Sequence, residues 1–156
     1  MTKEDLPLDL MKTWLDSLFE GMNEFVEEDT KIKILEKCGK ACSIYHHHIE
    51  KIKAMKTNGK DLEEIVNYMN QEKMWCGDWI QKGNTIYSIC KRCECPLVIS
   101  NIVKLSPTFC YCSRGFAKSV FEEILNSPVN VKLEKAIGRG DTVCHFIIEY
   151  NKQETR

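Results

Sequence analysis

The side chains best suited to chemistry in this 156-residue chain are its cysteines, of which there are nine. One cluster reads Cys90-x-x-Cys93-x-Cys95, and a second pair, Cys110-x-Cys112, follows one loop further on. Two short cysteine hairpins separated by a loop can bring four thiolates together around a tetrahedral zinc ion. We therefore expect a metal or thiolate centre formed by Cys93, Cys95, Cys110 and Cys112, with Cys90 in reserve. Zinc is the expected metal, because it tolerates all-thiolate tetrahedral sites. An iron–sulfur cluster is the alternative and fits these spacings less well.

Cys112 has a second interpretation, as a reactive thiol. If Ser113 caps a helix that runs on from Arg114, Cys112 lies near the unpaired N–H groups and the positive end of the helix dipole. That position, with the Arg114 guanidinium nearby, is expected to lower the pKa of the thiol. A lowered pKa serves metal binding, nucleophilic attack and redox exchange alike, so it marks a site without selecting its chemistry. A small apolar residue packed at a helix start is the plainer alternative.

The remaining cysteines and the histidines carry weaker signals. Cys38 and Cys42 are four residues apart and would share one face of a helix, where they could add metal ligands or form a redox pair. Core packing is the favoured interpretation for these two, and also for Cys76 and Cys144. The run His46-His47-His48 cannot direct three consecutive side chains to one point from a helix, so at most one of them is expected to join a site.

The helices and strands that position these residues can be predicted from the spacing of apolar residues along the chain. From Leu6 to Val26, apolar residues recur every three or four positions, which predicts a helix with one buried stripe. The same period from Leu35 to Ile52 predicts a second helix that ends at Asn58-Gly59. Asp61 and Glu64 resemble a capping box that opens a third helix.

The period changes after residue 72. Two runs rich in β-branched and aromatic residues flank Lys82-Gly83-Asn84 and predict a hairpin. A helix is expected from Arg114 to Leu125, followed by strands at Val129–Leu133 and Thr142–Tyr150. We therefore predict a single α+β domain over residues 1–156, with a helical half (1–72) packed on an antiparallel β-β-α-β-β unit (73–150).

Composition excludes several classes of partner. Lys and Arg number 22 against 23 Asp and Glu, so the chain lacks the broad positive charge of nucleic-acid-binding proteins. No stretch approaches the roughly eighteen consecutive apolar residues of a membrane span, and the N-terminus does not read as a signal peptide. We expect a cytoplasmic protein that binds neither nucleic acid nor membrane, with its cysteines present as thiols.

Two segments carry a family resemblance: Phe109-Cys110-Tyr111-Cys112-Ser113-Arg114-Gly115-Phe116 and Gly140-Asp141-x-x-Cys144-x-Phe146. They resemble the C-terminal half of vinyl-reductase-like small-molecule-binding domains. They are also similar to the aminothiazoline carboxylic acid hydrolase family and to small uncharacterised prokaryotic proteins with a Cys-Gly-x-x-Cys helix, here Cys38–Cys42. The resemblance covers residues 76–150 and implies an α+β fold with a small-ligand pocket. The hydrolase similarity implies ring opening of a small sulfur heterocycle.

Three functions follow, and whether the protein is an enzyme is left open. The favoured one is a small-molecule or metal-binding domain of sensor type, with the thiolate centre beside an apolar pocket and with output through a partner or a homodimer. The alternative is a thiol-dependent hydrolase of a small amino-acid-like substrate, with Cys112 as nucleophile and Arg114 attracting a carboxylate. The third is a redox protein that cycles a disulfide. A Cys110–Cys112 ring would be strained, so a more distant cysteine is the better partner.

Overall fold

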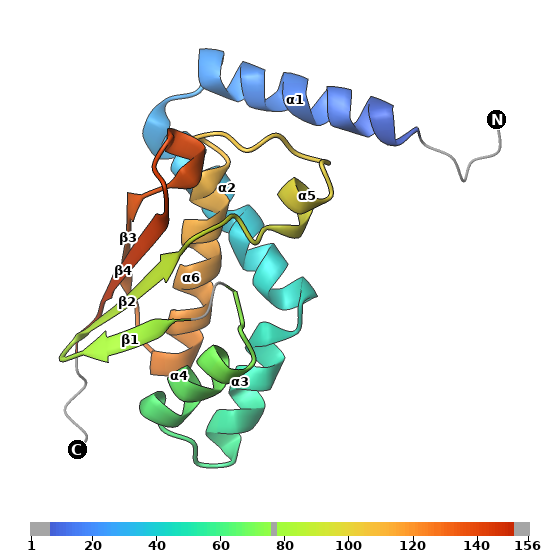
Figure 1. Cartoon of the computed structure of the whole chain (residues 1–156). Coiled ribbons are helices and arrows are strands. Elements are labelled where there is room, and N and C mark those ends of the chain that lie inside the picture. The colour runs from blue at the N-terminus through green and yellow to red at the C-terminus, as the bar shows by residue number, and fades with distance from the viewer. Residues whose placement is uncertain (1–6, 76–77, 152–156) are drawn as a thin grey trace.

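The computed structural model describes residues 7–75 and 78–151. Helices form most of the N-terminal half, and strands enter only after residue 78 (Figure 1). In chain order the elements are α1 (Leu8–Phe25), α2 (Glu28–Tyr45), α3 (His48–Thr57), α4 (Leu62–Gln71), β1 (Trp79–Lys82), β2 (Thr85–Cys90), α5 (Pro96–Ile99), α6 (Cys110–Leu125), β3 (Asn130–Lys135), the 3-10 turn η1 (Ile137–Arg139) and β4 (Cys144–Glu149).

The strands of the described residues form one antiparallel sheet in the order β1-β2-β4-β3. β1 and β2 make the expected hairpin, with Lys82 paired to Thr85 across a tight turn. Gly83 has φ = 61° in that turn, a conformation that glycine adopts without steric cost. β2 then pairs with β4 along its whole length, from Thr85 opposite Glu149 to Cys90 opposite Cys144. The α+β class and the β-β-α-β-β order predicted from the sequence are confirmed.

α6 is the centre of the molecule, because it lies between the sheet and α2 (Figure 1). Its Val120 and Phe121 are buried against the sheet, where they meet Phe146 and Ile148 of β4. Alternation along β4 thus turns Phe146 and Ile148 towards the core. Each large apolar side chain buried in this way stabilises the fold by about 1.5–3 kcal/mol relative to leaving it exposed.

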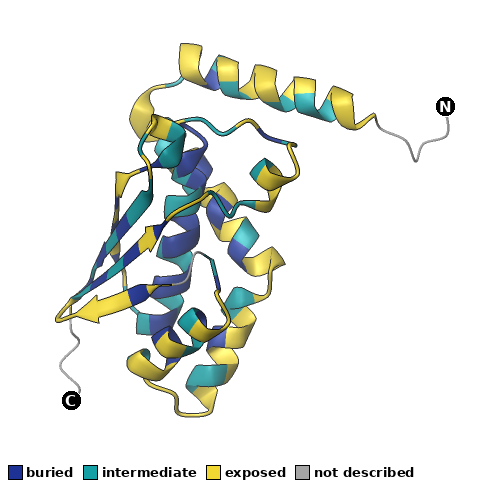
Figure 2. Cartoon of the chain, viewed as in Figure 1, coloured by how far each residue is buried: buried dark blue, intermediate teal, exposed yellow. Residues whose placement is uncertain are grey.

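α1 forms where it was predicted, but the expectation of one buried stripe along it is wrong. Trp14 is 63% exposed and Phe25 is 79% exposed. Only part of the helix contacts the body, chiefly through Phe19 and Met22, and the ring of Phe19 lies edge-on to Phe109 with 5.5 Å between centroids. The reason is the placement of α1, which crosses the end of the molecule and extends beyond the elements beneath it (Figure 2).

The second predicted helix is two helices. α2 ends at Tyr45 and α3 begins at His48, with a turn between them. His47 has φ = 58° in that turn, so the chain leaves the right-handed helical conformation for one residue. Hydrophobic period did not reveal the break, because apolar residues continue at helical spacing on both sides of it. The capping box of the next helix is confirmed: the Asp61 side chain accepts from the backbone N–H of Glu64, and the Glu64 carboxylate accepts from the backbone N–H of Asp61.

Within residues 7–75 and 78–151, no helix is both long and apolar enough to cross a membrane.

Candidate functional site

Two glycines allow α2 and α6 to pack backbone against backbone. A Cβ atom on Gly39 would overlap the backbone of Cys112 and Phe116, and a Cβ atom on Gly115 would overlap the backbone of Glu36. Glycine is the only residue that permits this approach without moving a helix. The contact positions the two thiols described next.

Cys42 of α2 and Cys112 of α6 form a hydrogen-bonded thiol pair. Cys112 is buried, whereas Cys42 is partly exposed. The Cys112 S–H donates to the Cys42 sulfur, and this hydrogen bond lowers the pKa of Cys42 to about 7, against the smaller opposing effect of burial. The pKa of Cys112 is raised, first by that same hydrogen bond and then by burial. Cys42 is therefore the sulfur that ionises near neutral pH.

The thiol pair opens into a groove of about 650 Å³ between α2, α6 and the segment that contains α5. Its walls are mainly apolar and aromatic. Its polar side chains are two histidines, one lysine, one glutamate, two serines, three thiols and the polar ends of one tyrosine and one tryptophan. The lining residues are Ala41, Cys42, Tyr45, His46, His48, Lys73, Trp75, Glu94, Cys95, Pro96, Leu97, Ser100, Ile102, Cys112, Ser113 and Phe116.

Aromatic contacts fix the wall of this groove near α3. The Phe116 ring lies 4.5 Å from Trp75 and 5.4 Å from His48, centroid to centroid. Nδ1 of His48 is buried and has no hydrogen-bond partner among the described residues. Burial lowers the pKa of His48, and the nearby His46 and Lys51 add to that effect. His48 is therefore biased to its neutral form and leaves one ring nitrogen available to a bound group.

A second set of sulfurs lines a small cavity of about 20 Å³ on the sheet side of α6. Cys93, Cys95, Cys110 and Cys144 all contribute to it. The backbone N–H of Ile137 donates to the Cys144 sulfur at 3.4 Å. Burial raises the pKa of Cys93, and it raises the pKa of Cys110 to about 11. Cys93 and Cys110 are therefore protonated at neutral pH, unlike Cys42.

The structure divides the four cysteines predicted to form a metal centre. Cys93, Cys95 and Cys110 border the small cavity, whereas Cys112 and again Cys95 border the larger groove. In the part of the chain that the structure describes, no group of three or more His, Cys, Asp or Glu residues is placed to hold a metal ion. Zinc or iron–sulfur binding at these cysteines stays a prediction, and metal analysis of protein purified without chelator is its test.

The reserve cysteines lie in three different settings. Cys38 is exposed on α2, and Cys42 is the groove thiol. Cys90, at the end of β2, is disulfide-bonded, so the expectation that the cysteines are thiols does not hold there. Cys76 lies outside the described residues. Cys144 is partly buried at the start of β4 and packs against the main core, in line with the core role expected of it.

The expected lowering of the Cys112 pKa is wrong. α6 begins at Cys110 and not after Ser113, and its N-cap residue, Phe109, makes no side-chain cap. Cys112 is therefore buried within the first turn, with its S–H committed to Cys42, and both effects favour the thiol form.

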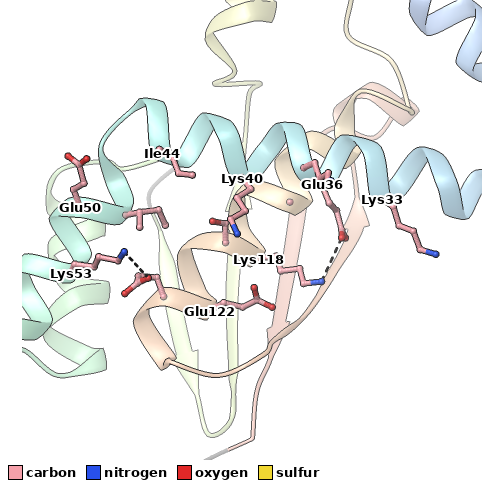
Figure 3. Close-up of a pocket in the computed structure, with 13 residues that line it drawn as sticks. Lys33, Glu36, Lys40, Ile44, Glu50, Lys53, Lys118 and Glu122 are labelled. Atoms are coloured by element: carbon pink, nitrogen blue, oxygen red, sulfur yellow. Dashed lines mark ion pairs between the residues drawn. The ribbon is translucent and has the colours of Figure 1, made fainter.

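Arg114 does not line the thiol groove. Its Nε lies 2.9 Å from Oε1 of Glu36 in an ion pair between α6 and α2. Glu36 belongs to a second, charged groove of about 870 Å³ along another edge of the α2–α6 contact (Figure 3). Lys118 Nζ lies 3.7 Å from a Glu36 oxygen there, and Lys53 Nζ lies 4.0 Å from one of Glu123. The charges of this groove thus partly neutralise one another.

Sequence reasoning missed most of the groove. His46 and His48 both line it, whereas a continuous helix would have allowed only one of them. The break at His47 makes the difference, because it changes the direction of the chain between them. Trp75 and Phe116 were not singled out, since neither stands in a chemical motif. The available signal was the Cys38-Gly39-x-x-Cys42 motif, whose glycine marks a close helix contact.

A family model matches residues 5–154. The chain belongs to DUF6144, a family of unknown function. Among solved structures, this DUF6144 protein resembles the crystal structure of a trafficking protein particle complex subunit 3 from Naegleria fowleri covalently bound to palmitic acid. The likeness covers 96% of this chain and 98% of that one, with a TM-score of 0.52 and 16% sequence identity, and therefore concerns the fold. No curated protein matches the sequence.

Proposed function

We propose that this DUF6144 protein is a small-molecule-binding domain that holds an apolar, carboxylate-bearing ligand in the groove beside Cys42 and Cys112. The observation that carries the proposal is the groove itself, of about 650 Å³ and lined mainly by apolar and aromatic side chains. Ligand sites typically measure about 300–1,000 Å³ and have such walls with a few placed polar groups.

The lining chemistry supports an apolar chain or ring as the main body of the ligand. Trp75, Leu97 and Phe116 offer it mainly hydrocarbon and aromatic surface. Each CH₂ group that leaves water for such a surface contributes about 0.8 kcal/mol to binding. The structurally similar trafficking subunit is covalently bound to palmitic acid, a molecule with such an apolar chain.

The polar groups of the groove support a carboxylate head. Lys73 supplies a cation, and His48 supplies a buried ring nitrogen that has no partner among the described residues. Glu94 is the one carboxylate in the lining, so positive and neutral donors predominate. A carboxylate that pairs with Lys73 in this open groove loses less of its hydration than it would in a closed cavity, so the ion pair costs less free energy to form.

The remaining parts of the sequence-based interpretation belong to the same proposal. The proposed role is of sensor type, in which a ligand in the thiol groove acts through a partner or a homodimer. The free thiols at Cys42, Cys95 and Cys112 support a cytoplasmic location, although Cys90 is disulfide-bonded.

Binding of a fluorescent polyene fatty acid, cis-parinaric acid, tests the proposal. We expect saturable binding that Leu97→Asp weakens about tenfold or more, because a charge replaces an apolar wall. Ile99→Asp is the matched control, since Ile99 lies on the same short helix, is 65% exposed and does not line the groove.

A second pair of variants acts by filling space. Ala41→Trp adds bulk on the groove side of α2, whereas Ile44→Trp adds it on the side of the charged groove. Only the first should weaken binding. Absence of saturable binding to the unmodified protein, or equal effects of the two members of either pair, would refute the proposed function.

A further inference from the structure

We propose that Cys42 and Cys112 form a thiol–disulfide exchange pair that reduces a low-molecular-weight disulfide entering the groove. The inference goes beyond ligand binding and does not depend on the proposed carboxylate ligand. It stands on the contact between the two thiols, on their different exposure and on the opening of the groove onto them.

The two sulfurs are held together by the fold. They come from α2 and α6, which pack backbone to backbone at Gly39 and Gly115, and they share one hydrogen bond. Both line the groove, so an incoming molecule reaches them from the same side. A pair fixed by two packed helices needs little rearrangement to meet the geometric demands of a disulfide.

Exposure assigns different roles to the two thiols. Cys42 is partly exposed, whereas only 7% of Cys112 is accessible to solvent. A substrate sulfur can therefore be attacked in line by Cys42 but not readily by Cys112. Cys42 is the nucleophile, and Cys112 is the resolving thiol that lies behind it.

The charge state of Cys42 suits that role. Its pKa of about 7 makes about half of it thiolate at neutral pH, and attacking thiols are most effective when their pKa is near the ambient pH. The titratable and charged groups around the pair come from every neighbouring element. They are Cys38 on α2, His46 just after it, His48 on α3, Lys73 after α4, Glu94 and Cys95 before α5, and Cys112 on α6.

The exchange proceeds in two balanced steps. The Cys42 thiolate attacks one sulfur of the substrate disulfide, the substrate S–S bond breaks, and one thiolate leaves while a mixed disulfide forms on Cys42. Cys112 then loses its proton to solvent and attacks the Cys42 sulfur, which forms the Cys42–Cys112 disulfide and releases the second thiolate. The substrate gains two electrons and the pair loses two. A dithiol reductant would return the pair to its starting state.

The order of these steps follows from the hydrogen bond. While Cys42 is a thiolate, it holds the Cys112 proton and keeps the pKa of Cys112 high. Once Cys42 is in a mixed disulfide it carries no charge, so that restraint on Cys112 disappears. The resolving thiol is thus activated only after the first attack.

Dithiobis(nitrobenzoic acid), an aromatic disulfide, is a suitable probe because each attack releases a coloured thiolate. The unmodified protein, mixed with less than one equivalent of probe, should release about two coloured thiolates per probe in a fast phase. Peptide mass spectrometry of the unmodified protein should then find Cys42 linked to Cys112.

Single variants separate the two roles. In Cys112→Ser we expect only one coloured thiolate per probe in the fast phase and a stable mixed disulfide on Cys42. In Cys42→Ser the fast phase should be lost. Cys38→Ser is the matched control, because Cys38 is an exposed thiol on the same helix that does not line the groove.

Survival of the fast phase in Cys42→Ser would overturn the inference. So would a probe-induced disulfide, other than the existing one of Cys90, that links a different pair of cysteines in the unmodified protein. The mapping uses no variant, so it decides the matter even if a substitution prevents folding. Failure of cis-parinaric acid to bind would refute the proposed function without changing either thiol measurement.

Discussion

The backbone of Gly39 in α2 lies directly against the carbonyl group of Cys112 in α6. The Cys42 thiol, one turn further along α2, reaches the Cys112 thiol as a result of this contact. The close approach of two helices thus determines both the position of a thiol and its pKa.

Gly39→Ala is therefore expected to destabilise the fold and to separate the thiols. Overpacking a tight interior costs about 1–3 kcal/mol, and here the new methyl group meets rigid backbone. Urea unfolding measures the loss. Gly21→Ala is the control, since nothing lies within 4 Å of a Cβ atom at Gly21 and alanine is favoured over glycine in a helix by about 1 kcal/mol. A loss of stability in Gly21→Ala as large as in Gly39→Ala would contradict this account of the contact.

The alkylation rate of Cys42 should rise with pH around a midpoint near its pKa of about 7. Cys112→Ala removes the S–H donor, so the midpoint should move up towards the ordinary thiol value of about 8.5. Cys112→Ser keeps a hydroxyl donor and should move it less. Iodoacetamide labelling followed by mass spectrometry of the Cys42 peptide gives both profiles. The same midpoint in the alanine variant and the unmodified protein would show that the hydrogen bond is not the cause.

The shifted pKa also predicts how stability depends on pH. The pKa of Cys42 is lower in the folded than in the unfolded protein, so the unfolded chain binds more protons between about pH 7 and the ordinary thiol range. The stability contributed by this thiol should rise with pH across that window and be lost as pH falls through about 7. The difference in unfolding free energy between the unmodified protein and Cys42→Ser, measured at pH 6 and about 8.5, tests the sign.

Features set by neighbouring residues were predictable from the sequence. The capping box at Asp61 and Glu64 depends on residues three apart, and the inward face of β4 follows from strict alternation through Phe146 and Ile148. Both are local consequences of backbone geometry. The hairpin at Gly83 is local in the same sense.

The thiol pair was not predictable in this way. Cys42 and Cys112 are seventy residues apart, and their contact depends on how α2 crosses α6. The spacing of apolar residues identifies the buried face of a helix, but it does not show which other helix packs against that face. The start of α6 was also misplaced, because Ser113 looks like a cap whereas the chain is already helical at Cys110. The expected direction of the Cys112 pKa was wrong for another reason: the hydrogen bond with Cys42 and burial both raise it, and neither could be inferred from local sequence.

The lysine of the groove offers a test of the ligand class. Lys73→Met keeps the length of the side chain and removes its charge, so it should weaken binding of cis-parinaric acid several-fold, as expected for a partly exposed ion pair. Binding of the corresponding alcohol, which carries no charge, should not change. Lys82→Met is the control, because Lys82 is an exposed residue of β1 outside the groove. Equal losses for acid and alcohol would indicate a structural role for Lys73.

The helix break at His47 makes a further prediction, because it brings both His46 and His48 to the groove. His47 has φ = 58°, and a left-handed conformation costs a residue with a side chain about 1–2 kcal/mol. His47→Gly should therefore stabilise the fold by up to about 1 kcal/mol after the greater chain entropy of glycine is subtracted. Loss of the exposed ion pair between His47 and Glu50 changes this gain in stability little.

The control is His46→Gly, which should destabilise the fold. His46 has φ = −82°, so glycine relieves no strain there and only its entropy cost remains. Urea unfolding of the two variants should give shifts of opposite sign, and a destabilised His47→Gly would show that the turn is not strained.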